Sequence, residues 1–304
     1  MNQKTKTITL ALLVMALWGS LFPCVKIGYK AFDIDPNSVA DILMFAAMRF
    51  TLCGAAITSF CFLMRKRLPA PPVKEVRNIL WIGVFAVALH YAFSYIGLSI
   101  TESSKTALLK QTGALIYVCF AFLFIKEETF SIFKIFGAIV GFFGIVALNM
   151  SSGGFSFGIG DMLILGASVC TVVSNIISRR SVQNVSAIWL TGISQSFGGG
   201  LLLILALAMG GKLPRFTADG ALIFAYICIA SIASYSLWYY TLIASALSHM
   251  FIIKFAEPVF ACIFGAVLLG ENILRPQYLA AFILICAGIV IGHCTYERKR
   301  IKHD

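Results

Sequence analysis

The sequence predicts an all-α integral membrane protein with ten transmembrane helices, arranged as two inverted five-helix repeats. Three observations lead to this fold class. Hydrophobic residues make up 60% of the 304-residue chain and charged residues only 12%, whereas a soluble protein carries about 25% charged residues. The apolar residues form runs long enough to cross a bilayer, which takes about 20 residues per helix. Finally, part of the second half repeats part of the first.

This composition excludes a cytosolic enzyme, a disordered chain and a nucleic-acid-binding protein. The net charge of +11 does not indicate nucleic acid, because the basic residues lie in short segments between apolar runs, as topology determinants do. The nine cysteines form no CxxC pair and lie almost entirely inside apolar runs. We therefore predict buried thiols, with no disulfide framework, metal or cofactor.

Ten runs are predicted to cross the membrane. In chain order they cover residues 7–28, 38–64, 76–99, 103–125, 130–150, 158–178, 186–209, 218–240, 246–269 and 274–295. The breaks between them contain turn and helix-breaking residues, among them Pro71-Pro72 and Gly210-Gly211. No small-residue cleavage site follows the first run, which we interpret as a retained span. The first repeat is placed at residues 1–150, and the second, with a basic cytoplasmic tail, at 151–304.

The Lys and Arg residues predict the orientation. With the N-terminus inside, the inner segments carry fifteen of these residues and the outer segments five. Cytoplasmic loops are enriched in Lys and Arg, so both termini are expected in the cytoplasm, in a multi-pass protein of the cell membrane. Four cations remain inside the runs: Lys26, Arg49, Lys110 and Lys254.

An internal repeat appears at a shift of 144 residues, where residues 91–147 align with 235–291 without a gap. The informative matches are Tyr91 with Tyr235, Tyr95 with Tyr239, Lys110 with Lys254, and Glu127 with Glu271. Each half holds five spans, and an odd number makes the second copy enter the membrane from the opposite side. Inverted repeats of this kind are typical of transporters that work by alternating access.

Several motifs now point to a family. They are Trp18 to Pro23 in the first span, Met48-Arg49-Phe50 in the second, the two tyrosine pairs, and Glu257-Pro258 and Gly270-Glu271 in and after the ninth. Their order and spacing resemble the drug/metabolite transporter superfamily, specifically its ten-span EamA-type branch. This resemblance implies that a small polar metabolite is moved, commonly outward, through a central cavity. One departure is Gly113-Ala114, which stands where the second half has Glu257-Pro258.

Charged side chains inside the spans are the main candidates for binding substrate, because such residues are costly in a bilayer and are commonly functional. Lys110 and Lys254 enter from opposite faces to depths of about 10–12 Å, so they bracket the midplane. Sugar-phosphate translocators, distant members of the superfamily, are similar in placing lysines on spans four and nine, where they bind an anion. Arg49 and Glu257 form either a structural pair or ligand contacts, and Lys26 can reach the outer interface.

Aromatic residues are the second group of candidates. Tyr91 and Tyr95 are four residues apart, as are Tyr235 and Tyr239, and Trp18 is a candidate neighbour. Such stripes commonly serve packing, but their repetition in both halves favours the lining of a cavity. The glycines at 137, 141, 144, 198–200, 288 and 292 are expected to let helices approach closely.

The predicted function is a secondary active transporter for a small polar metabolite. Four buried cations against one buried carboxylate favour a substrate with an anionic group, such as an amino acid, an organic acid or a phosphorylated metabolite. A proton or a counter-substrate would drive the transport, and the protein is either a monomer or a homodimer. One alternative is a proton-coupled multidrug exporter, but its four-span relatives use a carboxylate in the first span, which this chain lacks. A membrane-embedded enzyme or sensor is disfavoured, because no paired Asp, Ser–His or metal-ligand arrangement is present.

Overall fold

The computed structural model describes residues 3–35, 37–64, 68–100, 103–123, 128–148, 158–214, 217–244, 247–270 and 276–300. These residues form helices and connecting turns, with no strand among them. The helices are α1 (Gln3–Ala31), α2 (Val39–Leu63), α3 (Val73–Ile82), η1 (Gly83–Leu89), α4 (His90–Ser99), α5 (Ser103–Phe120), η2 (Ala121–Leu123), α6 (Ile132–Leu148), α7 (Ile159–Ser181), α8 (Ala187–Ala208), α9 (Ala218–Ala244), α10 (Leu247–Lys254), α11 (Ala256–Leu269) and α12 (Pro276–Arg300).

The prediction of an all-α, multi-pass membrane protein is confirmed. Among the described residues, seven helical segments are long and apolar enough to cross a membrane: α1, α2, α3 through α4, α7, α8, α9, and α10 with α11. Three shorter apolar stretches lie at Leu109–Leu123, Ile132–Gly144 and Leu279–Gly292. Within the described residues, each predicted run overlaps a helix. The crossing of the membrane by all ten runs and the inverted repeat remain predictions. Glu127 and Glu271, which the repeat aligns, lie outside the described residues.

Local side chains explain where several helices begin and end. The Ser38 hydroxyl accepts a hydrogen bond from the Asp41 N–H at 3.3 Å at the start of α2, and Ser186 caps α8 through the Trp189 N–H. Such caps satisfy N–H groups that have no partner inside the helix. Gly270 ends α11 with a φ of 69°, a left-handed conformation that glycine adopts without strain.

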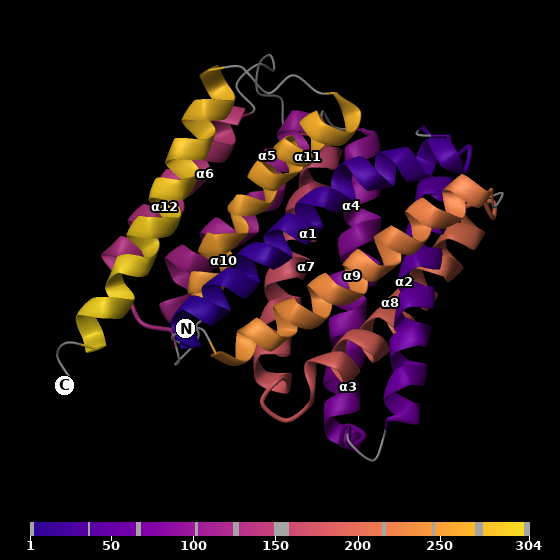
Figure 1. The fold of residues 1–304 in the computed structure, drawn as a ribbon, viewed down its shortest axis with the longest axis horizontal. Helices are drawn as coiled ribbons and strands as arrows, with labels where there is room; N and C mark the ends of the chain where they lie inside the picture. Colours follow the sequence, from indigo (N-terminus) through magenta and orange to yellow (C-terminus); the bar gives the residue numbers. More distant parts are fainter. Residues whose placement is uncertain are drawn as a thin grey trace.

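The helices pack in pairs that are distant in sequence (Figure 1). α6 lies along α12 at one edge of the bundle, and α2 lies along α8 at the opposite edge. α1 and α9 run side by side across the front of this view, with α4 and α7 packed together behind them. The middle of the molecule is therefore enclosed by segments from both halves of the chain.

Glycines bring the paired helices into backbone contact. A Cβ on Gly199 of α8 would lie 2.5 Å from the Thr51 nitrogen of α2, and one on Gly288 of α12 would lie 2.6 Å from the Gly137 oxygen of α6. The expectation of close approach is thus confirmed at these positions. It is wrong for Gly200, because a Cβ there would meet nothing within 4 Å.

A buried polar junction ties the start of α10 to the segment before α6. The Glu128 carboxylate accepts hydrogen bonds from the Ser248 hydroxyl at 2.6 Å and the Ser248 N–H at 3.1 Å. It also forms an ion pair with Lys134 at 3.3 Å. Lys134 and Glu128 are both buried, so this pairing compensates two charges that would otherwise be expensive to keep out of water.

Candidate functional site

Two tyrosines meet in the middle of the bundle. The hydroxyls of Tyr91 on α4 and Tyr235 on α9 lie 3.3 Å apart and are hydrogen-bonded. These residues are 144 positions apart, the same shift at which the two halves of the sequence align. Tyr95 and Tyr239 extend each stripe by one turn, with ring centroids 5.7 Å from Tyr91 and 6.3 Å from Tyr235. The structure therefore brings all four predicted tyrosines into one cluster.

Trp18 of α1 joins this cluster. Its ring centroid lies 5.6 Å from that of Tyr235 and 5.3 Å from that of Trp238. Trp238 is held in place by its indole N–H, which donates to the Asn175 side-chain oxygen of α7 at 2.7 Å. Since both partners of this hydrogen bond are buried, the Trp238 ring has a defined orientation beside Trp18.

Lys254 lies beside the rings of Trp18 and Trp238. Its Nζ atom is 5.3 Å from the Trp18 ring centroid and 5.8 Å from that of Trp238. An ammonium group within about 6 Å of an aromatic face is attracted by the ring quadrupole. The Lys254 charge thus faces two aromatic rings, with the Glu257 carboxylate as an electrostatic neighbour.

The helix is interrupted directly after Lys254. Pro258 has no N–H to offer the Lys254 carbonyl four residues earlier, and its ring would clash with that carbonyl in a continuous helix. α10 therefore ends at Lys254, and α11 begins at Ala256 after a turn at Phe255. In the first half, α5 continues unbroken through Gly113-Ala114. Phe255 itself keeps right-handed helical dihedral angles, with φ −62° and ψ −16°, and its N–H bonds to the Ile252 carbonyl three residues earlier at 3.2 Å. The interruption is therefore a local change in helical hydrogen bonding, not an unwound segment.

Lys110 of α5 approaches the same region. Its Nζ atom lies 6.0 Å from the Phe22 ring centroid of α1. Both Lys110 and Glu257 are electrostatic neighbours of Lys254, and both lysines are electrostatic neighbours of His90 on α4. The two repeat-related lysines are therefore brought together.

Arg49 of α2 occupies a second position beside the tyrosines. Its side chain is only 4% exposed, and its guanidinium carbon lies 4.2 Å from the Phe50 ring centroid and 5.5 Å from that of Tyr91. Within the described part of the chain its Nε has no hydrogen-bond partner. The pairing with Glu257 that the sequence allowed is not formed, because α2 directs Arg49 into the tyrosine cluster, where its electrostatic neighbours include Tyr91, Tyr95 and Tyr235.

Three aromatic residues of this region were not among the predicted site residues. Phe22 and Tyr29 follow Trp18 by four and eleven residues, so all three fall on one face of α1. Tyr29 is an electrostatic neighbour of Tyr95, and Phe50 contacts Tyr91 with ring centroids 4.6 Å apart. Helical periodicity could have identified Tyr29, whereas nothing in the sequence indicates which face of α2 carries Phe50.

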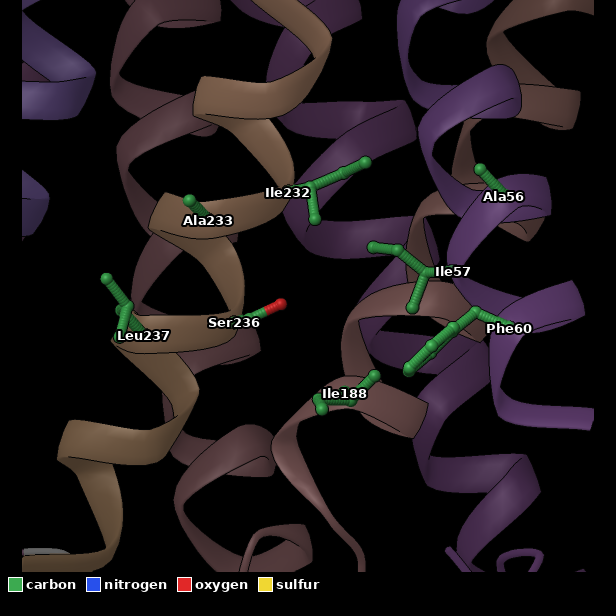
Figure 2. A pocket seen from close by; sticks show the side chains of 8 residues that line it. All are labelled: Ala56, Ile57, Phe60, Ile188, Ile232, Ala233, Ser236 and Leu237. Carbon is green, nitrogen blue, oxygen red and sulfur yellow. The ribbon is translucent and has the colours of Figure 1, made fainter. Parts of the chain in front are cut away.

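A separate groove of about 540 Å³ lies between α2, α8 and α9 (Figure 2). Its lining residues are almost all apolar: Ala56, Ile57, Phe60, Ile188, Ile232, Ala233, Ser236 and Leu237. The Ser236 hydroxyl points into it and donates to the Thr191 hydroxyl at 3.3 Å. None of the predicted site residues lines this groove, so the membrane-embedded charges gather elsewhere.

The described residues contain no group of three or more His, Cys, Asp or Glu side chains that could hold a metal ion. The groups at the centre of the bundle are cations, phenols, indole rings and the Glu257 carboxylate. Such a set can bind an anion by charge, accept or donate hydrogen bonds through the phenols, and pack against apolar carbon.

Comparisons with known proteins agree with this arrangement. The model of the EamA-like transporter family matches residues 5–150 and 158–292. An uncharacterized transporter of Archaeoglobus fulgidus is 25% identical over 296 residues, which cover 94% of this chain and 97% of the relative. The uncharacterized transporter YoaV of Bacillus subtilis is 23% identical, with 95% of this chain and 97% of the relative covered.

Two further matches extend this picture. The uncharacterized inner membrane transporter YedA of Escherichia coli K12 is 25% identical over 290 residues, 90% of this chain and 87% of the relative. A crystal structure that is 18% identical superposes with a TM-score of 0.76 over 97% of this chain and 98% of the other, which shows a shared fold. The family match spans most of the sequence, and the chain therefore belongs to the EamA-like transporter family, as a membrane transporter rather than an enzyme.

Proposed function

We propose that this transporter is a secondary active exporter of a small polar metabolite that carries an anionic group. The observation that carries the proposal is the placement of Lys254, whose ammonium group faces Trp18 and Trp238 with Lys110 as an electrostatic neighbour. Two like charges repel each other in a low-dielectric interior. A bound anion between them would remove that repulsion, which supports an anionic substrate.

The transport mechanism that we propose is alternating access between two inverted five-helix repeats, one at residues 1–150 and one at 151–304. The hydrogen bond between Tyr91 and Tyr235, residues that the repeat aligns, supports a binding site at the interface of the halves. The interruption between α10 and α11 supports a movable element there, since transporters commonly build their sites from discontinuous helices. A proton or a counter-substrate would drive the cycle.

The proposed setting is the cell membrane, with both termini in the cytoplasm. It rests on the excess of Lys and Arg in the inner segments. The partners are the bilayer and the small-molecule substrate, without nucleic acid, and the transporter would work as a monomer or a homodimer.

The test is thermal stabilisation of the detergent-purified protein by amino acids, organic acids and sugar phosphates. A ligand that binds only the folded state raises stability by RT ln(1 + [L]/Kd). We expect anionic compounds to raise the unfolding temperature of the wild type but not of Lys110→Gln or Lys254→Gln. Lys212→Gln is the matched control, because Lys212 is exposed on the loop after α8 and should leave the response intact.

Two results would contradict this proposal. The first is stabilisation by lipophilic cations alone, which would favour a cation exporter. The second is an equal response to anions in the two central lysine variants and in the wild type. For a compound that binds, release from loaded proteoliposomes of known protein orientation then tests the direction of transport.

A further inference from the structure

We propose that the substrate is a dianion held at both ends, with one anionic group at Arg49 and the other at Lys110 and Lys254. This inference rests on the proposed function and names the substrate class more narrowly. It assigns to Arg49 a binding role that the two lysines do not share.

The charge of the central region supports a dianion. Three cationic side chains gather there with one carboxylate, Glu257, so the formal net charge is +2. A monoanion would leave one positive charge uncompensated in a region where charge is expensive. A substrate with two negative charges would neutralise it.

The positive charge is divided between two places. Arg49 lies against the rings of Phe50 and Tyr91, while Lys254 lies against those of Trp18 and Trp238. Tyr91 and Tyr235 lie between the two places, since Tyr91 is beside Arg49 and Tyr235 packs on Trp18. A molecule with an anionic group at each end can contact both cations across these rings.

Arg49 has the geometry of a carboxylate-binding residue. Aromatic rings cover its guanidinium group, whose N–H donors point outward in the plane of the group. The side chain is almost fully buried, and within the described residues its Nε donor has no partner. A buried donor without a partner is unfavourable, and a carboxylate can accept from Nε and from a second N–H of the same guanidinium group at once.

A continuous row of rings connects the two places. Tyr91 contacts Arg49, and its hydroxyl lies 3.3 Å from that of Tyr235. Tyr235 in turn packs on Trp18, the ring beneath Lys254. A short carbon chain lying along this row would have phenol hydroxyls available for hydrogen bonds between its two anionic ends. The class that fits is therefore a small dicarboxylate, or an acid with one carboxylate and one phosphate.

The experiment compares diacids with their own monoesters, which keep the length but lose one charge. Binding of succinate, glutarate, phosphoglycolate, monomethyl succinate and monomethyl glutarate is measured from thermal stabilisation of the full-length protein. We expect at least one diacid to bind the wild type about tenfold more tightly than its monoester, the change expected from about one charge-assisted hydrogen bond. In Arg49→Gln this preference should fall to about one, because the second anionic group no longer gains a charged partner.

Arg49→Lys shows whether charge or shape matters, because it keeps the charge and loses the planar fork. An intermediate preference is expected. A cooperative unfolding transition without ligand shows that both variants are folded.

The outcomes separate this inference from the function on which it rests. If monoester and diacid bind the wild type equally, or Arg49→Gln keeps the full preference, the dianion assignment is wrong although anion transport stands. If diacids do not bind while monoanions do, it is also wrong. If Lys110→Gln and Lys254→Gln leave the binding of every anion unchanged, the proposed function itself fails.

Discussion

At the scale of single residues, the central cations and the glycines of α8 each have specific surroundings. Arg49 and Lys254 lie against aromatic rings, and Glu257 is the carboxylate beside Lys254. The glycines of α8 are equally specific, since neighbouring positions have opposite surroundings. Gly199 lies against the backbone of α2, whereas Gly200 has open space where a Cβ would stand.

Neighbouring glycines should therefore respond differently to the same substitution. Gly199→Ala should lower stability by about 1–3 kcal/mol, because the added methyl group would overpack the contact with Thr51. Gly200→Ala should leave stability unchanged or raise it by up to about 1 kcal/mol, because alanine favours helix. Unfolding temperatures in detergent measure both variants, and equal shifts would show that α2 and α8 are not in backbone contact.

At the scale of the helical elements, two interruptions shape the centre. A π-helical segment, η1, separates α3 from α4 just before His90 and Tyr91, and such segments are common at functional sites. The break between α10 and α11 follows from Pro258, which leaves the Lys254 carbonyl without its usual partner. The corresponding stretch of α5 lacks both the proline and the break, so the two halves differ in helix continuity at this position.

The break should be required for transport rather than for folding. Proline disfavours a continuous helix by about 3 kcal/mol, because it lacks an N–H and clashes with the carbonyl four residues earlier. Pro258→Ala restores an N–H that can bond to the Lys254 carbonyl and removes this clash. We expect an equal or higher unfolding temperature and a slower transport rate in proteoliposomes. Pro276→Ala is the control, because Pro276 is the first residue of α12, where no intrahelical bond is lost. Unchanged transport in Pro258→Ala would mean that the break is incidental.

At the scale of the whole molecule, the helices from the two halves interlock. α6 packs on α12, α2 on α8, and α1 on both α9 and α11. The central cations, tyrosines and tryptophans consequently come from helices of both halves. A small rearrangement of one half against the other would alter access to all of them together.

The orientation of the molecule has a direct test in cysteine labelling. In a cysteine-free background, Lys212→Cys should react with a membrane-impermeant maleimide in intact cells, because its loop is predicted to be outside. Gln183→Cys, which follows Arg179 and Arg180 on the predicted inner side, should react only after the membrane is permeabilised. Both positions are exposed in the structure, so access to the reagent decides the result, and the reverse pattern would invert the topology.

The fold class was predictable because it depends on properties that the sequence displays directly. Apolar runs of sufficient length must be helices in lipid, where every backbone group has to be satisfied within the segment. The same apolar runs place Arg49 and Lys254 in helical segments long enough to cross a membrane, and Lys110 in a shorter apolar helix. The tyrosine stripes were visible because helical spacing places them on one face.

Only the tertiary structure decided which of these residues meet. The sequence allowed Arg49 to pair with Glu257, but the packing of α2 places it against Phe50 and Tyr91 instead. Lys254 meets Trp18, a residue more than 230 positions away, because α1 crosses between α9 and α11. Composition and periodicity act along one helix, whereas these contacts depend on the rotation and crossing of several helices at once.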